Sequence, residues 1–395
     1  MFWPVAYCRF ALRRCILLRL CLSVCVFVVL SFTALAQVPA TIADQMTSDE
    51  HLAKPGWWPR KAEAARINYV GAAVCAECHS VLAQSQQQHA MAHSSMPVSE
   101  AEGLKKPIGY DIGQFHYSII PDNGAATYTV TNGSQSFSAP ILWAFGSGKH
   151  GQSFLFENKG DLYEARISYF RSLGIGITPD HPTGIPVSLD DALGRKIDKD
   201  EALKCLGCHA TAAVTGGKLN PGQMIFGVSC EGCHGPGAAH VALARAGNSS
   251  PGMIANPGRW DPVTSVDFCG SCHRTWWDVD QLGYHGLRNV RFAVYRLQTS
   301  RCWGKGDARI TCVACHDPHK PLVTELSAYD QKCLSCHVKS ASLPLTADHP
   351  GRGCPVSASN CASCHMPTYQ LPQMNNPFTD HQIRIVRDTK TFPDE

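Results

Sequence analysis

The pattern C-x-x-C-H occurs seven times between residues 75 and 365 of this 395-residue chain. The seven triplets are Cys75, Cys78 and His79; Cys205, Cys208 and His209; Cys230, Cys233 and His234; Cys269, Cys272 and His273; Cys312, Cys315 and His316; Cys333, Cys336 and His337; and Cys361, Cys364 and His365. Chance predicts about 0.05 copies at this content of cysteine and histidine. The repetition therefore constrains the chain more than any other feature.

Two thiols three positions apart, followed at once by an imidazole, are the pattern of covalent c-type haem attachment. The thiols reach the two vinyl groups of the porphyrin, and the histidine binds the iron from the proximal face. Zinc knuckles also use paired cysteines, but they do not require a histidine after every second cysteine. A disulfide framework explains an even number of cysteines but not the histidines. The sequence therefore predicts seven covalently bound haem c groups, each with its iron.

Residues 1–36 have the pattern of a secretory signal peptide, with arginines before an apolar run and Ala34-Leu35-Ala36 as a cleavage site. A retained membrane anchor is the alternative, although the apolar run is shorter than the roughly 20 residues of a membrane span. Haem c is attached outside the cytoplasm, which agrees with export. We expect a periplasmic protein, with the cell surface or the extracellular space as alternatives.

The spacing of the motifs predicts the organisation of the rest of the chain. Residues 37–68 form a lead-in without periodicity, and 69–107 hold the first motif. Residues 108–170 carry alternating apolar segments with turn signals between them, which predicts a small antiparallel β subdomain between the first and second haem motifs. The remaining six motifs crowd into 171–395. That region leaves little protein for each haem, so we expect an irregular fold, mostly short α-helices and loops wrapped around covalent haems.

Several strings resemble those of multihaem c-type cytochromes, in particular the tetrahaem carrier cytochromes of ammonia oxidisers and the hydroxylamine oxidoreductase superfamily. They include CHGPGAAH from Cys233, CVACHDPH from Cys312, CHMP from Cys364 and FTDH from Phe378. The resemblance covers roughly residues 69–383 and implies a class of fold. Seven motifs differ from the four of the small carriers and the eight of the oxidoreductases, so no single template applies.

The histidines outside the motifs are candidates for distal ligands of the haem iron. The resemblance implies this role for His240, His319 and His381, because the related proteins use the histidines of these strings as ligands. His89 and His93 are four positions apart and would share one face of a helix. His181, His285 and His349 are further candidates, whereas His116 and His150 lie in or beside the β segment and His51 lies in the lead-in. We expect mostly bis-histidine, low-spin haems.

Cys302 and Cys354 belong to no motif. In an exported protein two spare thiols commonly pair, which predicts a Cys302–Cys354 disulfide, with two free thiols as the alternative.

Taken together, these features favour a carrier of single electrons between redox protein partners, with donor and acceptor unidentified. No basic run supports a nucleic-acid partner, and a membrane enters only through export or a retained anchor. No cluster of residues identifies a catalytic site. The alternative is a multihaem oxidoreductase of nitrogen or sulfur compounds, in which one haem is five-coordinate.

Overall fold

The computed structural model describes residues 65–248, 254–276, 278–279, 283–300, 302–303, 310–337, 354–371 and 374–386. All of them belong to one compact unit, Ser48–Glu395. The signal peptide and most of the predicted lead-in lie outside the described residues. Within those ranges, no helix is both long enough and apolar enough to span a membrane.

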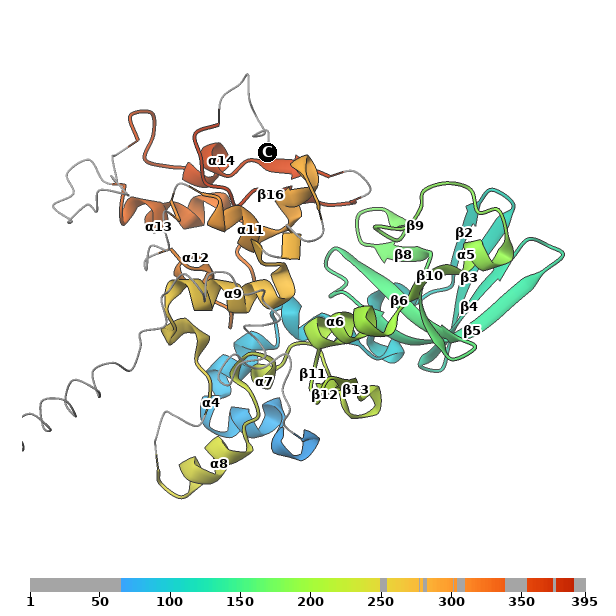
Figure 1. Ribbon diagram of the computed structural model, residues 1–395, viewed down its shortest axis with the longest axis horizontal. Helices are drawn as coiled ribbons and strands as arrows, with labels where there is room; N and C mark the ends of the chain where they lie inside the picture. Colours follow the sequence, from blue (N-terminus) through green and yellow to red (C-terminus); the bar gives the residue numbers. More distant parts are fainter. Residues whose placement is uncertain are drawn as a thin grey trace, which may run out of the picture. The chain divides into compact units, whose positions relative to one another are not determined.

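A ten-stranded antiparallel sheet runs from residue 95 to residue 197 (Figure 1). Its main path has the order β10-β7-β6-β5-β4-β3-β2, while β1 pairs with β5, and β8 pairs with β6 and β9. The strands are β1 (Ser95–Met96), β2 (Ile108–Ile112), β3 (Phe115–Asp122), β4 (Ala125–Thr131), β5 (Ser136–Phe145), β6 (Gly151–Asn158), β7 (Asp161–Ala165), β8 (Ile167–Phe170), β9 (Gly174–Ile177) and β10 (Gly194–Ile197).

Alternating side chains build the core of this sheet. In β3 the residues Phe115, Tyr117 and Ile119 are almost completely buried, and the residues between them face outward. They join Tyr128 of β4 and Phe156 of β6 in one apolar cluster. Because successive strand residues point to opposite faces, this alternation directs one face of the hairpin to the core.

Two tight hairpins fix the register of the sheet. Asn123 and Gly124 form the two-residue turn between β3 and β4, with φ values of 45° and 86°. Lys159 and Gly160 form the turn between β6 and β7, with φ values of 53° and 85°. Turns with two positive φ angles match the twist of the strands that they join, and Asn-Gly is the preferred sequence for them.

Short helices joined by loops and 3₁₀ turns occur in the described residues outside this sheet. They are α4 (Ala72–Gln86), α5 (Leu189–Leu193), α6 (Lys199–His209), α7 (Cys230–His234), α8 (Ala238–Arg245), α9 (Pro262–His273), α11 (Ala293–Gln298), α12 (Cys312–Cys315), α13 (Asp330–Leu334) and α14 (Cys361–His365). Two-stranded sheets pair β11 (Ala210–Thr211) with β14 (Ile225–Phe226), β12 (Val214–Thr215) with β13 (Lys218–Leu219), and β15 (Thr368–Gln370) with β16 (Pro377–Thr379).

The apolar clusters around the C-x-x-C-H motifs are small. Twenty buried residues form the cluster of the sheet, whereas four, including Val266, Val294 and Trp303, form the largest cluster among α9 and its neighbours. The described residues around α9 therefore form a much smaller apolar core than the sheet does.

The predicted combination of short helices with an antiparallel sheet is confirmed. The strands extend beyond the predicted 108–170, because β1 and β10 are too short and too polar for their alternation to be recognised. The wrapping of the chain around haems and the domain boundaries stay predictions.

Candidate functional site

Each C-x-x-C-H motif has at least part of its sequence in a helix. Four of these helices, α6, α7, α9 and α14, end at the histidine of their motif. Helical geometry places the two cysteines, three positions apart, on the same face. In these four motifs the helix ends directly after the second cysteine, at the histidine whose imidazole would bind the iron.

Several of the predicted iron ligands have a fixed ring orientation. Nδ1 of His234 donates to the carbonyl of Ala255 at 2.7 Å, and Nδ1 of His365 donates to that of Arg384 at 2.8 Å. Nδ1 of His381 donates to the Thr379 carbonyl at 3.0 Å. A hydrogen bond of this kind keeps the proton on Nδ1 and leaves Nε2 available to bind a metal.

Three motif histidines face a second histidine. The ring centroids of His79 and His240 are 6.5 Å apart. Those of His234 and His319 are 5.9 Å apart, and those of His316 and His381 are 6.2 Å apart. An imidazole nitrogen binds a metal at about 2 Å, so two imidazoles on opposite sides of one iron have centroids about 6 Å apart. All three separations therefore fit an iron held between two histidines.

Removal from water makes these rings good ligands. Desolvation lowers the pKa of His234, and it also lowers the pKa of His316 and of His381. Each ring is therefore neutral near pH 7, and the neutral imidazole is the form that binds a metal.

The motifs themselves associate in pairs. Helix α4 packs against α7, α9 against α12, and α13 against α14. These helix contacts bring together the first and third, the fourth and fifth, and the sixth and seventh motifs.

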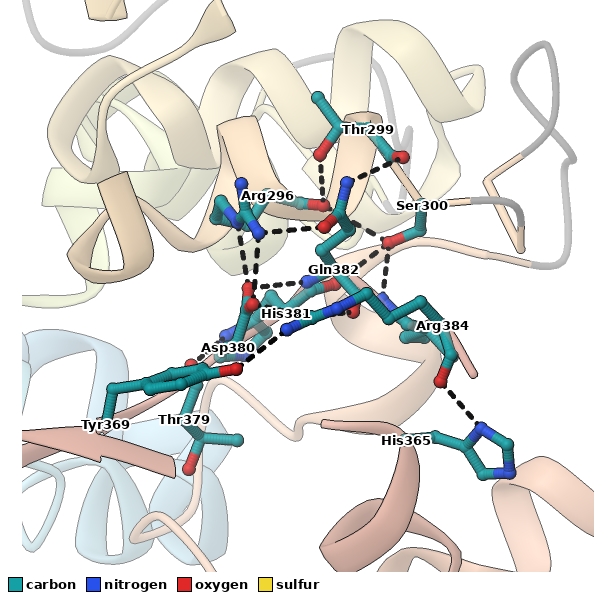
Figure 2. A network of polar contacts seen from close by, with 11 residues as sticks. Arg296, Thr299, Ser300, His365, Tyr369, Thr379, Asp380, His381, Gln382 and Arg384 are labelled. Carbon is teal, nitrogen blue, oxygen red and sulfur yellow. Dashed lines mark hydrogen bonds and ion pairs between the residues drawn. The ribbon is translucent and has the colours of Figure 1, made fainter. Parts of the chain in front are cut away.

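A buried ionic network holds two of the candidate ligands (Figure 2). Asp380 is fully buried and accepts from Nε of Arg296 at 2.8 Å and from Nη1 of Arg384 at 2.6 Å. Burial raises the pKa of Asp380, but the Arg296 guanidinium outweighs it and keeps that pKa below its usual value. Ser300 donates to the carbonyl of His381 at 2.9 Å, and the carbonyl of Arg384 accepts from His365. The network therefore fixes the backbone beside both imidazoles.

The second motif is held by the sheet. His209 donates from Nδ1 to the carbonyl of Ser94 at 3.0 Å, and the hydroxyls of Ser94 and Ser95 donate to the carbonyl of His209. The ring of Phe145 lies parallel to that of His209, with centroids 4.9 Å apart. Strands β1 and β5 thus set the orientation of this histidine.

The remaining motif histidines have fewer contacts that bear on ligation. His273 lies at the end of α9, where desolvation and the neighbouring His209 lower its pKa. His337 is half-buried just beyond α13, and its backbone N–H donates to the carbonyl of Cys333 at 2.9 Å.

The two histidines after the first motif use ring nitrogens in local bonds. Nδ1 of His89 accepts from the backbone N–H of Met91 at 3.0 Å, and Nε2 of the exposed His93 bonds to the carbonyl of Gln87 at 2.7 Å. They do not share one helix face as expected, because α4 ends at Gln86 and a 3₁₀ turn follows. Their role as distal ligands stays a prediction.

The other distal candidates lie in different surroundings. His181 is buried, with Nε2 at 3.2 Å from Glu164, and its Nδ1 is enclosed by protein. His285 is exposed, and His349 lies outside the described residues. His116 bonds to Asp111 on the surface of the sheet, and His150 is exposed.

Cys302 and Cys354 are both half-buried, and their pairing stays a prediction. Backbone hydrogen bonds from Ser357 and Val356 lower the pKa of Cys354.

Sequence reasoning missed the acidic side chains that hold the site together. Asp380 precedes His381 directly in FTDH, so its place beside a candidate ligand was a usable signal. Glu231 lies inside the third motif and is 1% exposed, and Asp330 precedes the sixth motif and is 8% exposed. Nothing in the sequence distinguishes these two from solvated acids.

Comparisons with known proteins agree with the motifs. The family described as "Cytochrome c554 and c-prime" matches residues 187–235, which hold the second and third motifs. The multiheme cytochrome MtrA of Shewanella baltica (strain OS185) is 24% identical over 172 residues, which are 41% of this chain and 45% of that protein. The alignment thus spans less than half of the relative. The crystal structure of the outer cell wall cytochrome OcwA aligns with 83% of this chain and 82% of its own, with a TM-score of 0.49 and 14% identity.

Proposed function

We propose that this chain, whose sequence similarities support a multihaem c-type cytochrome that transfers electrons, is an exported heptahaem carrier. In this proposal all seven C-x-x-C-H motifs hold a haem c, and the protein passes single electrons between redox partners. The narrower relation to the tetrahaem carriers of ammonia oxidisers and to hydroxylamine oxidoreductase is part of the proposal.

The single observation that carries the proposal is the set of three histidine pairs. Each pair joins a motif histidine to one of the three histidines that the FTDH, CHDPH and CHGPGAAH strings had indicated, at 5.9–6.5 Å. We assign His240 to the iron of the first motif, His319 to that of the third and His381 to that of the fifth. Zinc knuckles would instead bring four ligands together around one ion, and the described residues contain no group of metal-binding side chains of that kind.

The assignments share one rule of connectivity. His240 follows the third motif, His319 follows the fifth and His381 follows the seventh. Each of these motifs therefore supplies the distal ligand of the odd-numbered motif before it. This linkage ties successive haem sites into one rigid assembly, as a carrier needs if the distances between its redox centres are to stay constant.

Haem supplies reversible one-electron chemistry when it is bound, and its potential follows the axial ligands, burial and hydrogen bonding. The chain's own residues determine the axial ligands, the burial and the hydrogen bonding of each haem. Carbonyl groups such as that of Ala255 orient the imidazoles, and the packing of α4 against α7 brings two attachment sites together. Two histidine ligands leave no exchangeable position on an iron, which favours electron transfer over substrate binding.

Optical and EPR spectra of the exported protein test this function. We expect spectra dominated by low-spin haem that respond to a one-electron reductant and do not change when nitrite or hydroxylamine is added. A high-spin component that shifts on adding either compound would favour the alternative, an oxidoreductase with one five-coordinate haem.

A further inference from the structure

A buried carboxylate joins the first motif to the third. Glu231 belongs to α7, and its Oε1 accepts from the backbone N–H of Val70 and of Gly237, both at 2.8 Å. Its Oε2 accepts from the N–H of Gly71 at 2.8 Å. Val70 and Gly71 lead into α4 with the first motif, and Gly237 leads into α8 with His240. One side chain thus holds both chain segments that supply ligands to the first iron.

The sixth and seventh motifs repeat the arrangement. Asp330 opens α13, where Cys333 lies, and it is buried. Its Oδ2 accepts from the N–H of Asn360 at 2.7 Å, and its Oδ1 accepts from that of Cys361 at 2.8 Å. Asn360 precedes α14 in a left-handed conformation with φ of 55°. Asp330 thus connects α13, which contains the first cysteine of the sixth motif, to Cys361, the first residue of the seventh motif.

The fourth and fifth motifs have a related acid. Asp267 lies on α9 two positions before Cys269, is 5% exposed, and accepts from Nε2 of Gln298 at 3.0 Å. Gln298 belongs to α11, which packs against α9. Buried carboxylates thus join two motifs through backbone N–H groups in the α4–α7 pair and in the α13–α14 pair.

Each of these carboxylates lies beside a cysteine that would carry a porphyrin. Glu231 directly follows Cys230 in the third motif, and Asp330 accepts from the backbone N–H of Cys361. A carboxylate that is removed from water interacts strongly with charges nearby, because little solvent screens it. Hydrogen bonds from backbone N–H groups to a carboxylate are charge-assisted and short, as the 2.7–2.8 Å distances at Glu231 and Asp330 show.

We propose that Glu231 and Asp330 are positioning residues that lock two C-x-x-C-H motifs together and, through their negative charge, lower the reduction potentials of the two haems of each pair. This inference rests on the proposed haem attachment. A negative charge beside an iron favours the oxidised state, which carries one more positive charge than the reduced state. A residue with a structural role alone would not alter a potential in this way.

The chain provides a matched control for Glu231. Glu77 is an acid between the two cysteines of the first motif, one position later than Glu231 in the third, and its side chain is 54% exposed and pairs with Arg245 at the surface. Solvent and counter-ions screen a charge of that kind. Glu325, which is exposed near the sixth motif, is the control for Asp330.

The test compares Glu231→Gln with Glu77→Gln, and Asp330→Asn with Glu325→Gln, in the exported full-length protein. Peptide mass mapping first counts the haems, and an optical redox titration then measures their potentials. We expect Glu231→Gln to raise the potentials of two of the seven haems and Glu77→Gln to leave the titration unchanged. We expect the same contrast between Asp330→Asn and Glu325→Gln.

The haem content of the variants can also support or overturn the inference. Loss of haem confined to the Cys75 and Cys230 peptides in Glu231→Gln would support the inference, because it would show that the carboxylate acts on that pair. Loss spread over all seven motifs would overturn it, and so would full haem content with a titration curve equal to that of the control. A wild-type protein without haem would instead overturn the proposed function, so the two failures are distinguishable.

Discussion

The imidazole rings of His234 and His319 face each other with centroids 5.9 Å apart and planes within 8° of parallel. The two residues are 85 positions apart in the chain; His234 ends the third C-x-x-C-H motif, and His319 follows the fifth. A contact over this sequence distance, at the separation that suits two ligands of one metal, is the strongest geometric indication of haem binding in the structure.

Replacing the distal member of this pair tests the assignment. We predict that His319→Ala converts one haem in seven, that of Cys230 and Cys233, from low spin to high spin, because its iron loses the sixth ligand. EPR and the high-spin charge-transfer band measure the change. His116→Ala is the control, since His116 is exposed on the surface of the sheet, where it bonds to Asp111. Equal spectra of the two variants would contradict the assignment.

The ionic network of Figure 2 predicts a large loss of stability when its centre is removed. Asp380→Asn leaves the charges of Arg296 and Arg384 without their carboxylate in a buried position. Breaking a buried ion pair from one side costs about 3 kcal/mol. Denaturant unfolding followed by circular dichroism in the haem region measures the loss.

The control for this variant is Asp161→Asn, which removes an exposed pair with Lys196. Surface pairs of this kind contribute little, so we expect its unfolding midpoint to match that of the wild type. A midpoint for Asp380→Asn that also matches the wild type would show that the network is not stabilising.

A close backbone approach predicts a further sensitive position, just before the third motif. Gly227 has φ of +70°, and a Cβ atom there would lie 1.9 Å from the carbonyl oxygen of Ala92. We expect Gly227→Ala to destabilise the protein by about 2 kcal/mol or more, because the residue would adopt a strained conformation and push against backbone. Gly222→Ala is the control, since nothing lies within 4 Å of the added atom. Similar unfolding midpoints for both variants would contradict this account.

The spare cysteines give a prediction that mass spectrometry checks. If Cys302 and Cys354 form a disulfide, the native protein is lighter than the reduced protein by two hydrogen atoms, and neither thiol reacts with an alkylating reagent before reduction. Labelling of both thiols in the native protein would exclude the bond.

Short-range patterns are the source of the sequence predictions. The motifs, the antiparallel strands within 108–170, and the choice of His240, His319 and His381 as distal candidates all come from local strings. The match between a distal histidine and its motif does not, because the connection from His381 to His316 depends on how α12 and the C-terminal segment pack. The burial of Glu231 was hidden for the same reason, since two of its partners, Val70 and Gly71, are at least 160 positions away.

Peptide mass mapping of the exported protein tests the central claim most directly. The account predicts that all seven C-x-x-C-H peptides carry the added mass of one haem, with seven irons per chain and no zinc. A folded, colourless protein whose motif cysteines bind zinc or form disulfides with one another would contradict it.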